Sequence, residues 1–100
     1  MGSEVVEFMP IIYKATAPSG NSYIGQTICS LQTRVNGHRS KKSGRVADLP
    51  INKAFQKYGA LMQVSVIAKV PKRLLNHAEK TFIKFFDTHA NGYNCTPGGD

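Results

Sequence analysis

Apolar and polar residues alternate along three short segments of the chain, which is the pattern of strands that bury one face. The first two segments, residues 10 to 16 and 22 to 28, are joined by the turn sequence "PSGN" at positions 18 to 21. Proline presets one turn angle and glycine permits a left-handed one, so the two segments predict a β-hairpin. The third segment, "MQVSVIAKV" at residues 62 to 70, alternates in the same way. It predicts a strand whose buried residues are Met62, Val64, Val66 and Ala68.

Three further segments have the wider apolar spacing of helices. One extends from residue 31 to about residue 42, with Ser30 as its N-cap. A second extends from about residue 48 to residue 58, with Pro50 in its first turn and Gly59 at its end. The last extends from about residue 72 to residue 88. The element order β-β-α-α-β-α predicts an α+β fold, in which a small, three-stranded, mainly antiparallel sheet is flanked by three helices.

The length of 100 residues suits a single domain, and residues 1–100 are expected to form one. Residues 1–9 are expected to be flexible, and the opening "MGS" matches an expression remnant. The closing "TPGGD" indicates a junction within a longer protein. The chain has no apolar run long enough to cross a bilayer and lacks the pattern of a secretion signal. A cytoplasmic protein without membrane contact is therefore expected.

Positive charge dominates the composition. Lysine and arginine number 13 against 6 acidic residues, for a formal net charge of +7. The stretch "RVNGHRSKKSGR" at residues 34 to 45 holds a cluster of these cations and no acid. Clustered cations bind polyanions, and we expect nucleic acid as the partner. The residues expected to contact its phosphates are Arg39, Lys41, Lys42 and Arg45.

The two cysteines, Cys29 and Cys95, stand far apart and belong to no CxxC pair. This spacing predicts reduced, packed thiols and indicates neither a disulfide framework nor a zinc ribbon. A zinc site that adds His38, His77 or His89 to the cysteines lacks the usual ligand spacing.

Two tyrosines, Tyr13 and Tyr23, stand on either side of the predicted turn. Because side chains alternate along a strand, the two phenols share a face only if paired residues have numbers with an even sum. That pairing requires an odd loop or a bulge, and "PSGN" supplies either. The alternative is that both tyrosines are ordinary residues of amphipathic strands.

A cation and an acid also occupy notable helix positions. Arg34 and His38 lie four residues apart, so they share one helix face beside the apolar stripe. An arginine at such a border suits bidentate binding of a phosphate, although it also suits simple packing over apolar neighbours. In the last helix the helical period places Glu79 within the apolar face, between Phe86 and Ile83. A carboxylate there must be protonated, paired with a cation or bound to a metal ion, and a structural pair with Arg34 or a lysine is the alternative to a functional role.

Taken together, these residues resemble the GIY-YIG nuclease family. The resemblance rests on "IIY" and "YIG" about ten residues apart, the Arg–His pair, the glutamate of the last helix and a closing "GYN", and it extends from Ile11 to Asn94. It departs from the family pattern at Ile11, which replaces the first glycine of the motif. The resemblance implies a structural role for Gly25, a supporting role for Asn94, and catalytic roles for Tyr13, Tyr23, Arg34, His38 and Glu79.

The resemblance further implies a metal-dependent endonuclease that hydrolyses DNA phosphodiester bonds. Glu79 would bind one ion, Mg²⁺ or Mn²⁺, and Arg34 would stabilise charge on the phosphoryl oxygens. Tyr13 would act as general base, with its pKa lowered by Arg34 or the metal, while Tyr23 and His38 orient the phosphate or the water.

The expected substrate is duplex DNA in preference to single strands. In this family the catalytic module is often joined to a separate DNA-binding region, and the compact motif spacing favours a homing endonuclease. A non-catalytic, basic nucleic-acid-binding module remains the alternative function, since it explains the charge cluster equally well. A small structural or protein-interaction domain is a third possibility.

Overall fold

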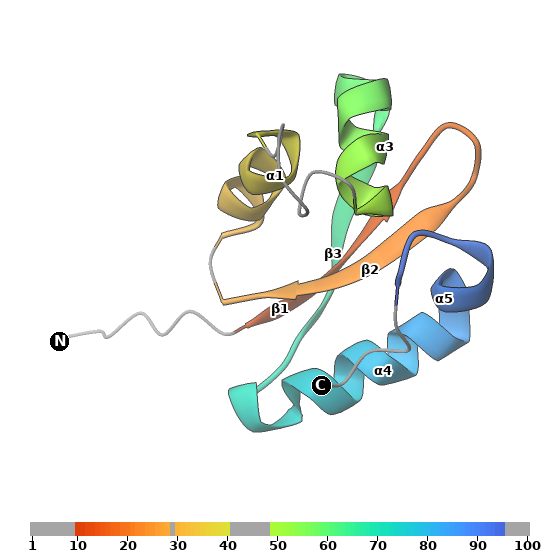
Figure 1. The fold of residues 1–100 in the computed structure, drawn as a ribbon. Helices are drawn as coiled ribbons and strands as arrows, with labels where there is room; N and C mark the ends of the chain where they lie inside the picture. The colour runs from red at the N-terminus through yellow and green to blue at the C-terminus, as the bar shows by residue number, and fades with distance from the viewer. Residues whose placement is uncertain (1–9, 29, 41–48, 96–100) are drawn as a thin grey trace, which may run out of the picture.

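The computed structural model describes residues 10–28, 30–40 and 49–95 (Figure 1). Two 3₁₀ turns, η1 at Gly59–Leu61 and η2 at Lys72–Leu74, precede the last strand and the longest helix. The strands and helices are, in chain order, β1 (Ile11–Thr16), β2 (Ser22–Thr27), α1 (Leu31–Ser40), α3 (Pro50–Tyr58), β3 (Gln63–Lys69), α4 (Leu75–Phe86) and α5 (Thr88–Asn91).

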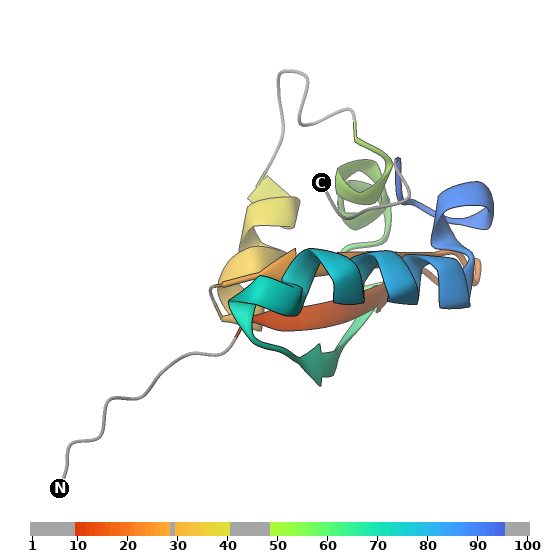
Figure 2. The same cartoon turned by 90° about the horizontal axis from the view of Figure 1, so that it is seen from below.

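The three strands form one antiparallel sheet in the order β2-β1-β3. In Figure 1, α1 and α3 lie on one side of this sheet and α4 lies on the other. Viewed from below, α4 crosses in front of the strands (Figure 2). The predicted α+β class and element order are confirmed. No helix among the described residues is long and apolar enough to cross a membrane.

The hairpin has the register that places both tyrosines on one face. Tyr13 pairs with Gly25 and Ala15 pairs with Tyr23, so the paired residue numbers sum to the even value 38. The loop is closed by a hydrogen bond of 2.9 Å from the Ala17 amide to the Asn21 carbonyl, which leaves three residues between the bonded pair. Gly20 supplies the left-handed backbone, with φ of 96°. The prediction of a shared face is confirmed.

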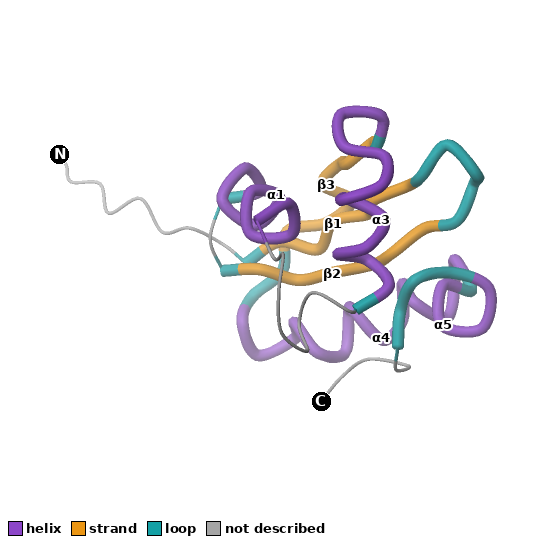
Figure 3. The backbone as a smooth tube through the Cα atoms, turned by 45° about the horizontal axis from the view of Figure 1, so that its top comes forward, coloured by secondary structure: helices purple, strands orange, loops and turns teal. Residues whose placement is uncertain are grey.

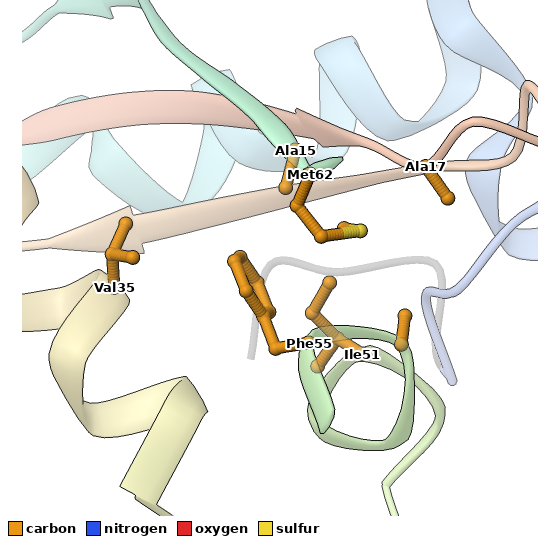
Figure 4. Packing of buried hydrophobic residues seen from close by; sticks show 7 residues of the cluster. Ala15, Ala17, Val35, Ile51, Phe55 and Met62 are labelled. Atoms are coloured by element: carbon orange, nitrogen blue, oxygen red, sulfur yellow. The ribbon is translucent and has the colours of Figure 1, made fainter. Parts of the chain in front are cut away.

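Each face of the sheet carries its own apolar core. On the α1 and α3 side, Phe55 is almost fully buried and lies between Val35 and Ile51 (Figure 4). Other members of that core are Ala15, Ala17, Ala54 and Met62. On the α4 side, the buried residues are Ile12, Ile24, Leu75 and Ile83.

Helix boundaries follow the predicted capping residues. The Ser30 hydroxyl accepts a hydrogen bond of 3.2 Å from the Thr33 amide, as expected of an N-cap. Pro50 opens α3 and Gly59 follows its end. The predicted extension of the first helix to Lys42 lies outside the described residues.

The alternation predicted for β3 is wrong at Val66. The partner of Ile12 is Ala68, but the partner of the next residue, Tyr13, is Val66, so Ile67 is an extra residue in β3. This bulge shifts the faces of the strand. Ile67 and Ala68 therefore pack in the α4-side core, while Val66 is 42% exposed.

The last helix is also shorter than predicted. It ends at Phe86 because Asp87 adopts a left-handed conformation with φ of 56°, and α5 begins after it. The preceding turn, up to Leu74, is a 3₁₀ helix. Leu74 in η2 and Phe85 in α4 are exposed, although Phe86 packs against the α4-side core.

Candidate active site

Tyr13 lies at the centre of a cluster of predicted site residues. Its side chain points from β1 toward α1 and has no solvent exposure. Its hydroxyl lies 2.8 Å from Nε2 of His38 and accepts a hydrogen bond of 3.2 Å from Nε of Arg34. The expected pair on α1 therefore converges on one phenol, with Arg34 exposed at the surface and His38 buried behind it.

Tyr23 is the second ring of this cluster. Its centroid lies 6.1 Å from that of Tyr13 and 5.7 Å from that of His38. Gly25 makes this packing possible, because a Cβ atom at that position would overlap the Tyr13 ring and approach Cε2 of Tyr23 to 2.7 Å. The structural role expected for Gly25 therefore has a steric basis.

His38 is fixed on both sides of its ring. Its imidazole stacks on Phe55 at a centroid distance of 5.1 Å and an interplanar angle of 2°. Its Nδ1 lies 2.7 Å from Oδ1 of Asn52, which is 2% exposed. The helical position of His38 suggested the border of the apolar stripe, but the ring is buried because α3 covers this part of α1.

Glu79 lies at the edge of the sheet. It was predicted within the apolar face of the helix, but it is half-buried, since α4 packs beside the edge strand β2. The Gln26 amide donates a hydrogen bond of 3.0 Å to Oε1 of Glu79 and another of 3.0 Å to Oδ1 of Asn76. Gln26 therefore fixes one oxygen of the carboxylate.

Asn94 occupies the free edge of β2. Its Oδ1 accepts a hydrogen bond of 2.8 Å from the Ile24 amide, and its Nδ2 donates one of 2.9 Å to the Ile24 carbonyl. The Tyr93 amide donates a further bond of 2.8 Å to the Ser22 carbonyl. The segment after α5 thus turns back beside β2 (Figure 3).

A cavity of about 160 Å³ opens at this edge. Tyr23, Glu79 and Asn94 line it from β2, α4 and the closing segment, and α3 contributes Ile51. Tyr23 is the link between the cavity and the Tyr13 cluster. The six predicted site residues therefore lie in one contiguous region, and Glu79 is not separated from the tyrosines by the sheet.

Burial and charge shift the ionisation of the phenols. Burial raises the pKa of Tyr13, and Arg34 lowers it by a smaller amount. The pKa of Tyr23 is also raised by burial, with Arg34 opposing the shift and Glu79 adding to it. The lowering of the Tyr13 pKa that a phenolate base requires at neutral pH is therefore not supplied by Arg34.

The two phenols also shift the pKa of Arg34. Burial alone would lower the pKa of its guanidinium, but the hydrogen bond from Arg34 to Tyr13 and the charges of both phenols raise the pKa overall. Arg34 is therefore a permanent cation beside the two tyrosines.

The structure says less about the remaining predicted residues. The side chain of Arg39 and the residues Lys41, Lys42 and Arg45 lie outside the described part of the chain, as does Cys29. Cys95 was expected to be packed but is exposed, at the mouth of the cavity that it helps to line. Within the described residues, no group of three or more His, Cys, Asp or Glu side chains could hold a metal ion.

Two residues in contact with the site were not predicted. Asn52 has a sequence signal, since it is a polar residue beside Ile51 in the buried stripe of α3. Gln26 has none, because a polar residue at its place in an alternating strand is ordinary.

The sequence matches no protein-family model and no curated protein. Two solved structures share the fold. One is the catalytic domain of the intron endonuclease I-TevI in a mutant form, with a TM-score of 0.70 and 21% identity over 89% of this chain and 95% of that chain. The other is the catalytic domain of the homing endonuclease I-TevI, with a TM-score of 0.69 and 22% identity over 87% of this chain and 98% of that chain. The chain therefore has the fold of a GIY-YIG nuclease catalytic domain, as the sequence motifs indicated.

Proposed function

We propose that this chain is the catalytic domain of an endonuclease that hydrolyses phosphodiester bonds in DNA. The observation that carries the proposal is the contact of Tyr13 with both Arg34 and His38, beside a cavity shared by Tyr23 and Glu79. Residues distant in sequence have thus been gathered into one charged and phenolic cluster. The fold of the endonuclease I-TevI supports the same function.

We propose that one divalent ion with a preference for oxygen ligands binds at this cavity, held by a single protein carboxylate. The residues that line it include Glu79, Tyr23 and Asn94, and Gln26 donates a hydrogen bond to the Glu79 carboxylate. Mg²⁺ or Mn²⁺ can be bound by one protein carboxylate if water and substrate phosphate complete its shell. We assign this ligand role to Glu79. When bound, the ion would offset the negative charge of the reacting phosphate and make water more acidic.

Arg34 supplies the fixed positive charge. Its Nε–H is held by the Tyr13 hydroxyl, so the guanidinium is oriented before substrate binds. We assign it the stabilisation of charge that builds on the non-bridging phosphoryl oxygens. Positioned donors of this kind contribute about 3 to 4 kcal/mol to transition-state stabilisation.

Tyr13 is assigned as the general base, with His38 as the acceptor of its proton. A free phenolate is disfavoured because burial raises the pKa of Tyr13. The proton of the attacking water would pass to the Tyr13 oxygen while the phenolic proton passes to Nε2 of His38, 2.8 Å away. The resulting hydroxide would attack phosphorus while the bond from phosphorus to the departing ester oxygen breaks, and that oxygen would take a proton from solvent water. Since Tyr13 has no exposed surface, water reaches it beside the exposed Arg34 side chain, and Tyr23 orients the phosphate from the cavity.

The decisive experiment is nicking of a supercoiled plasmid in Mg²⁺ by Glu79→Gln. Loss of the carboxylate removes the metal ligand, so cleavage should fall by at least about 100-fold, while DNA binding stays equal or becomes tighter. Asp87→Asn is the matched control, because it removes the same charge from an exposed acid beyond the end of α4. Wild-type cleavage by Glu79→Gln would contradict the assignment.

A non-catalytic nucleic-acid-binding module is the second candidate, supported by the net charge of +7. It would bind DNA with a steep salt dependence but nick no plasmid in any divalent metal. It offers no reason for the buried Tyr13–His38 contact.

The substrate form is tested with supercoiled, linear and single-stranded DNA of one sequence. We propose that duplex is preferred and that a separate DNA-binding region in a longer parent chain supplies sequence preference, as in a homing endonuclease. Phosphate contacts by the basic cluster at residues 34 to 45 carry no sequence information. Equal cleavage of single strands would contradict the duplex preference.

A further inference from the structure

We propose that Asn52, in the first turn of α3, is a positioning residue that fixes the tautomer of His38, so that Nε2 is the nitrogen available to Tyr13. The proposal rests on the function proposed above. It adds a polar residue on α3 to the predicted site residues, which lie on β1, β2, α1, α4 and the closing segment.

The contact is short and fully enclosed. Oδ1 of Asn52 lies 2.7 Å from Nδ1 of His38, and the two residues are 2% and 5% exposed. Phe55, one turn further along α3, stacks flat against the same imidazole. One helix therefore supplies both the floor beneath the ring and the hydrogen-bond partner at its edge.

The chemistry of the amide decides where the proton lies. An amide oxygen accepts hydrogen bonds but cannot donate one, so Nδ1 of His38 must carry its proton toward Asn52. In a neutral imidazole the other nitrogen is then an acceptor. Nε2 consequently accepts the Tyr13 hydroxyl proton, and the Tyr13 oxygen remains free to accept from Nε of Arg34.

This arrangement has a direct consequence for proton transfer. When the water proton moves to Tyr13 and the phenolic proton moves to Nε2, His38 becomes an imidazolium with both nitrogens hydrogen-bonded. Tyr13 is neutral at the end of the step, and its original phenolic proton is on Nε2 of His38. In the opposite tautomer Nε2 would carry a proton and could not receive another.

Several described groups face His38. The titratable groups that contact it or its partner Tyr13 include Tyr13 itself on β1, Tyr23 on β2 and Arg34 on its own helix. From α3 the ring meets Asn52 and Phe55, which do not titrate. An amide at this position therefore fixes the orientation of the ring without stabilising its charge.

Two substitutions separate this role from simple packing. Asn52→Leu keeps the branched shape of the side chain and removes the acceptor, and the single-turnover cleavage rate should fall by about 10-fold to 100-fold with DNA binding unchanged. Asn52→Asp keeps the acceptor and adds a negative charge, which stabilises the imidazolium. The acid limb of its pH–rate profile should therefore move to higher pH by about one to three units, with cleavage recovered above that limb. Asn36→Leu, at an exposed position of α1, is the matched control.

The tautomer can be measured without any activity. Long-range ¹H–¹⁵N correlation spectra report which imidazole nitrogen is protonated, and the signals of His77 and His89 are removed one at a time by substitution with Gln. In the wild-type protein Nδ1 of His38 should carry the proton, and Asn52→Leu should lose that preference.

The outcomes distinguish the two proposals. Absence of cleavage by the wild-type protein would refute the proposed function, while the spectra would still test Asn52. A folded Asn52→Leu protein with the wild-type tautomer and cleavage rate would overturn the role of Asn52. If Asn52→Leu fails to fold, as judged by circular dichroism, Asn52→Asp carries the test, and an unmoved acid limb overturns the role.

Discussion

The two faces of the sheet are built by different means. The α4 side buries only aliphatic residues at its centre, including Ile12, Ile24 and Ile83. The α1 and α3 side adds a buried polar group, the Tyr13–His38–Asn52 series, beside its apolar core. Buried polar groups stabilise a fold only when every member has a partner. The comparison indicates that the α4 side mainly stabilises the domain. The α1 and α3 side also buries polar side chains of the candidate site.

The sharpest test of this division compares two large truncations. Phe55→Ala and Leu75→Ala each remove a buried side chain. The free energy of unfolding should fall by about 3 to 5 kcal/mol for Phe55→Ala and by about 2 to 5 kcal/mol for Leu75→Ala. Cleavage per folded molecule should fall only for Phe55→Ala, because it removes the stacking surface beneath His38. Denaturant unfolding and single-turnover cleavage check both values. Equal loss of cleavage in the two variants would break the comparison.

A smaller change on the same face should also separate packing from chemistry. Gly25→Ala forces the Tyr13 and Tyr23 rings apart, since the new methyl group overlaps both. Overpacking of this kind costs about 1 to 3 kcal/mol, and cleavage should be lost even at temperatures where the variant is folded. Gly37→Ala is the control, because a Cβ atom there meets no neighbouring atom within 4 Å. Full cleavage by Gly25→Ala would show that the spacing of the phenols is unimportant.

Gln26 tests the connection between β2 and α4. Gln26→Leu removes the hydrogen bond to Glu79 and should weaken Mg²⁺ binding by about 10-fold to 100-fold, with little change in stability. The Mg²⁺ concentration that gives half-maximal cleavage measures the effect. An unchanged metal dependence would mean that the carboxylate is positioned by its other contacts.

The smallest effect concerns alkaline pH. Burial raises the pKa of Tyr13 above its ordinary value of 10.0, so the unfolded chain releases this proton first as the pH rises. The stability contributed by the neutral phenol is therefore complete below about pH 10 and declines above it, by at most about 1.4 kcal/mol per pH unit for one proton. Tyr13→Phe should flatten this decline in urea unfolding measured from pH 9 to 11. An identical slope in both proteins would show that Tyr13 does not titrate in this range.

The sequence predicted features with strict local geometry. Strand alternation and the odd loop were sufficient to place Tyr13 and Tyr23 on one face, and Ser30 and Gly59 marked helix ends through their capping preferences. Such features depend on residues that are close in sequence, so they can be predicted from a single sequence.

Features that depend on packing between elements were not predicted. The bulge at Ile67 reflects the register of β1 against β3, and the position of Glu79 depends on where α4 crosses the sheet edge. Asn52 meets His38 only because α3 packs across α1, which no local pattern reveals. The basic cluster beyond Arg39 lies outside the described residues and stays a prediction.

The closing segment has a consequence for solubility. Tyr93 and Asn94 satisfy backbone groups of β2 that would otherwise be open to a strand from another molecule. The same segment forms one wall of the cavity that holds Glu79. Any disturbance that detaches it should therefore produce self-association and loss of the proposed Mg²⁺ binding together, with one shared midpoint on heating.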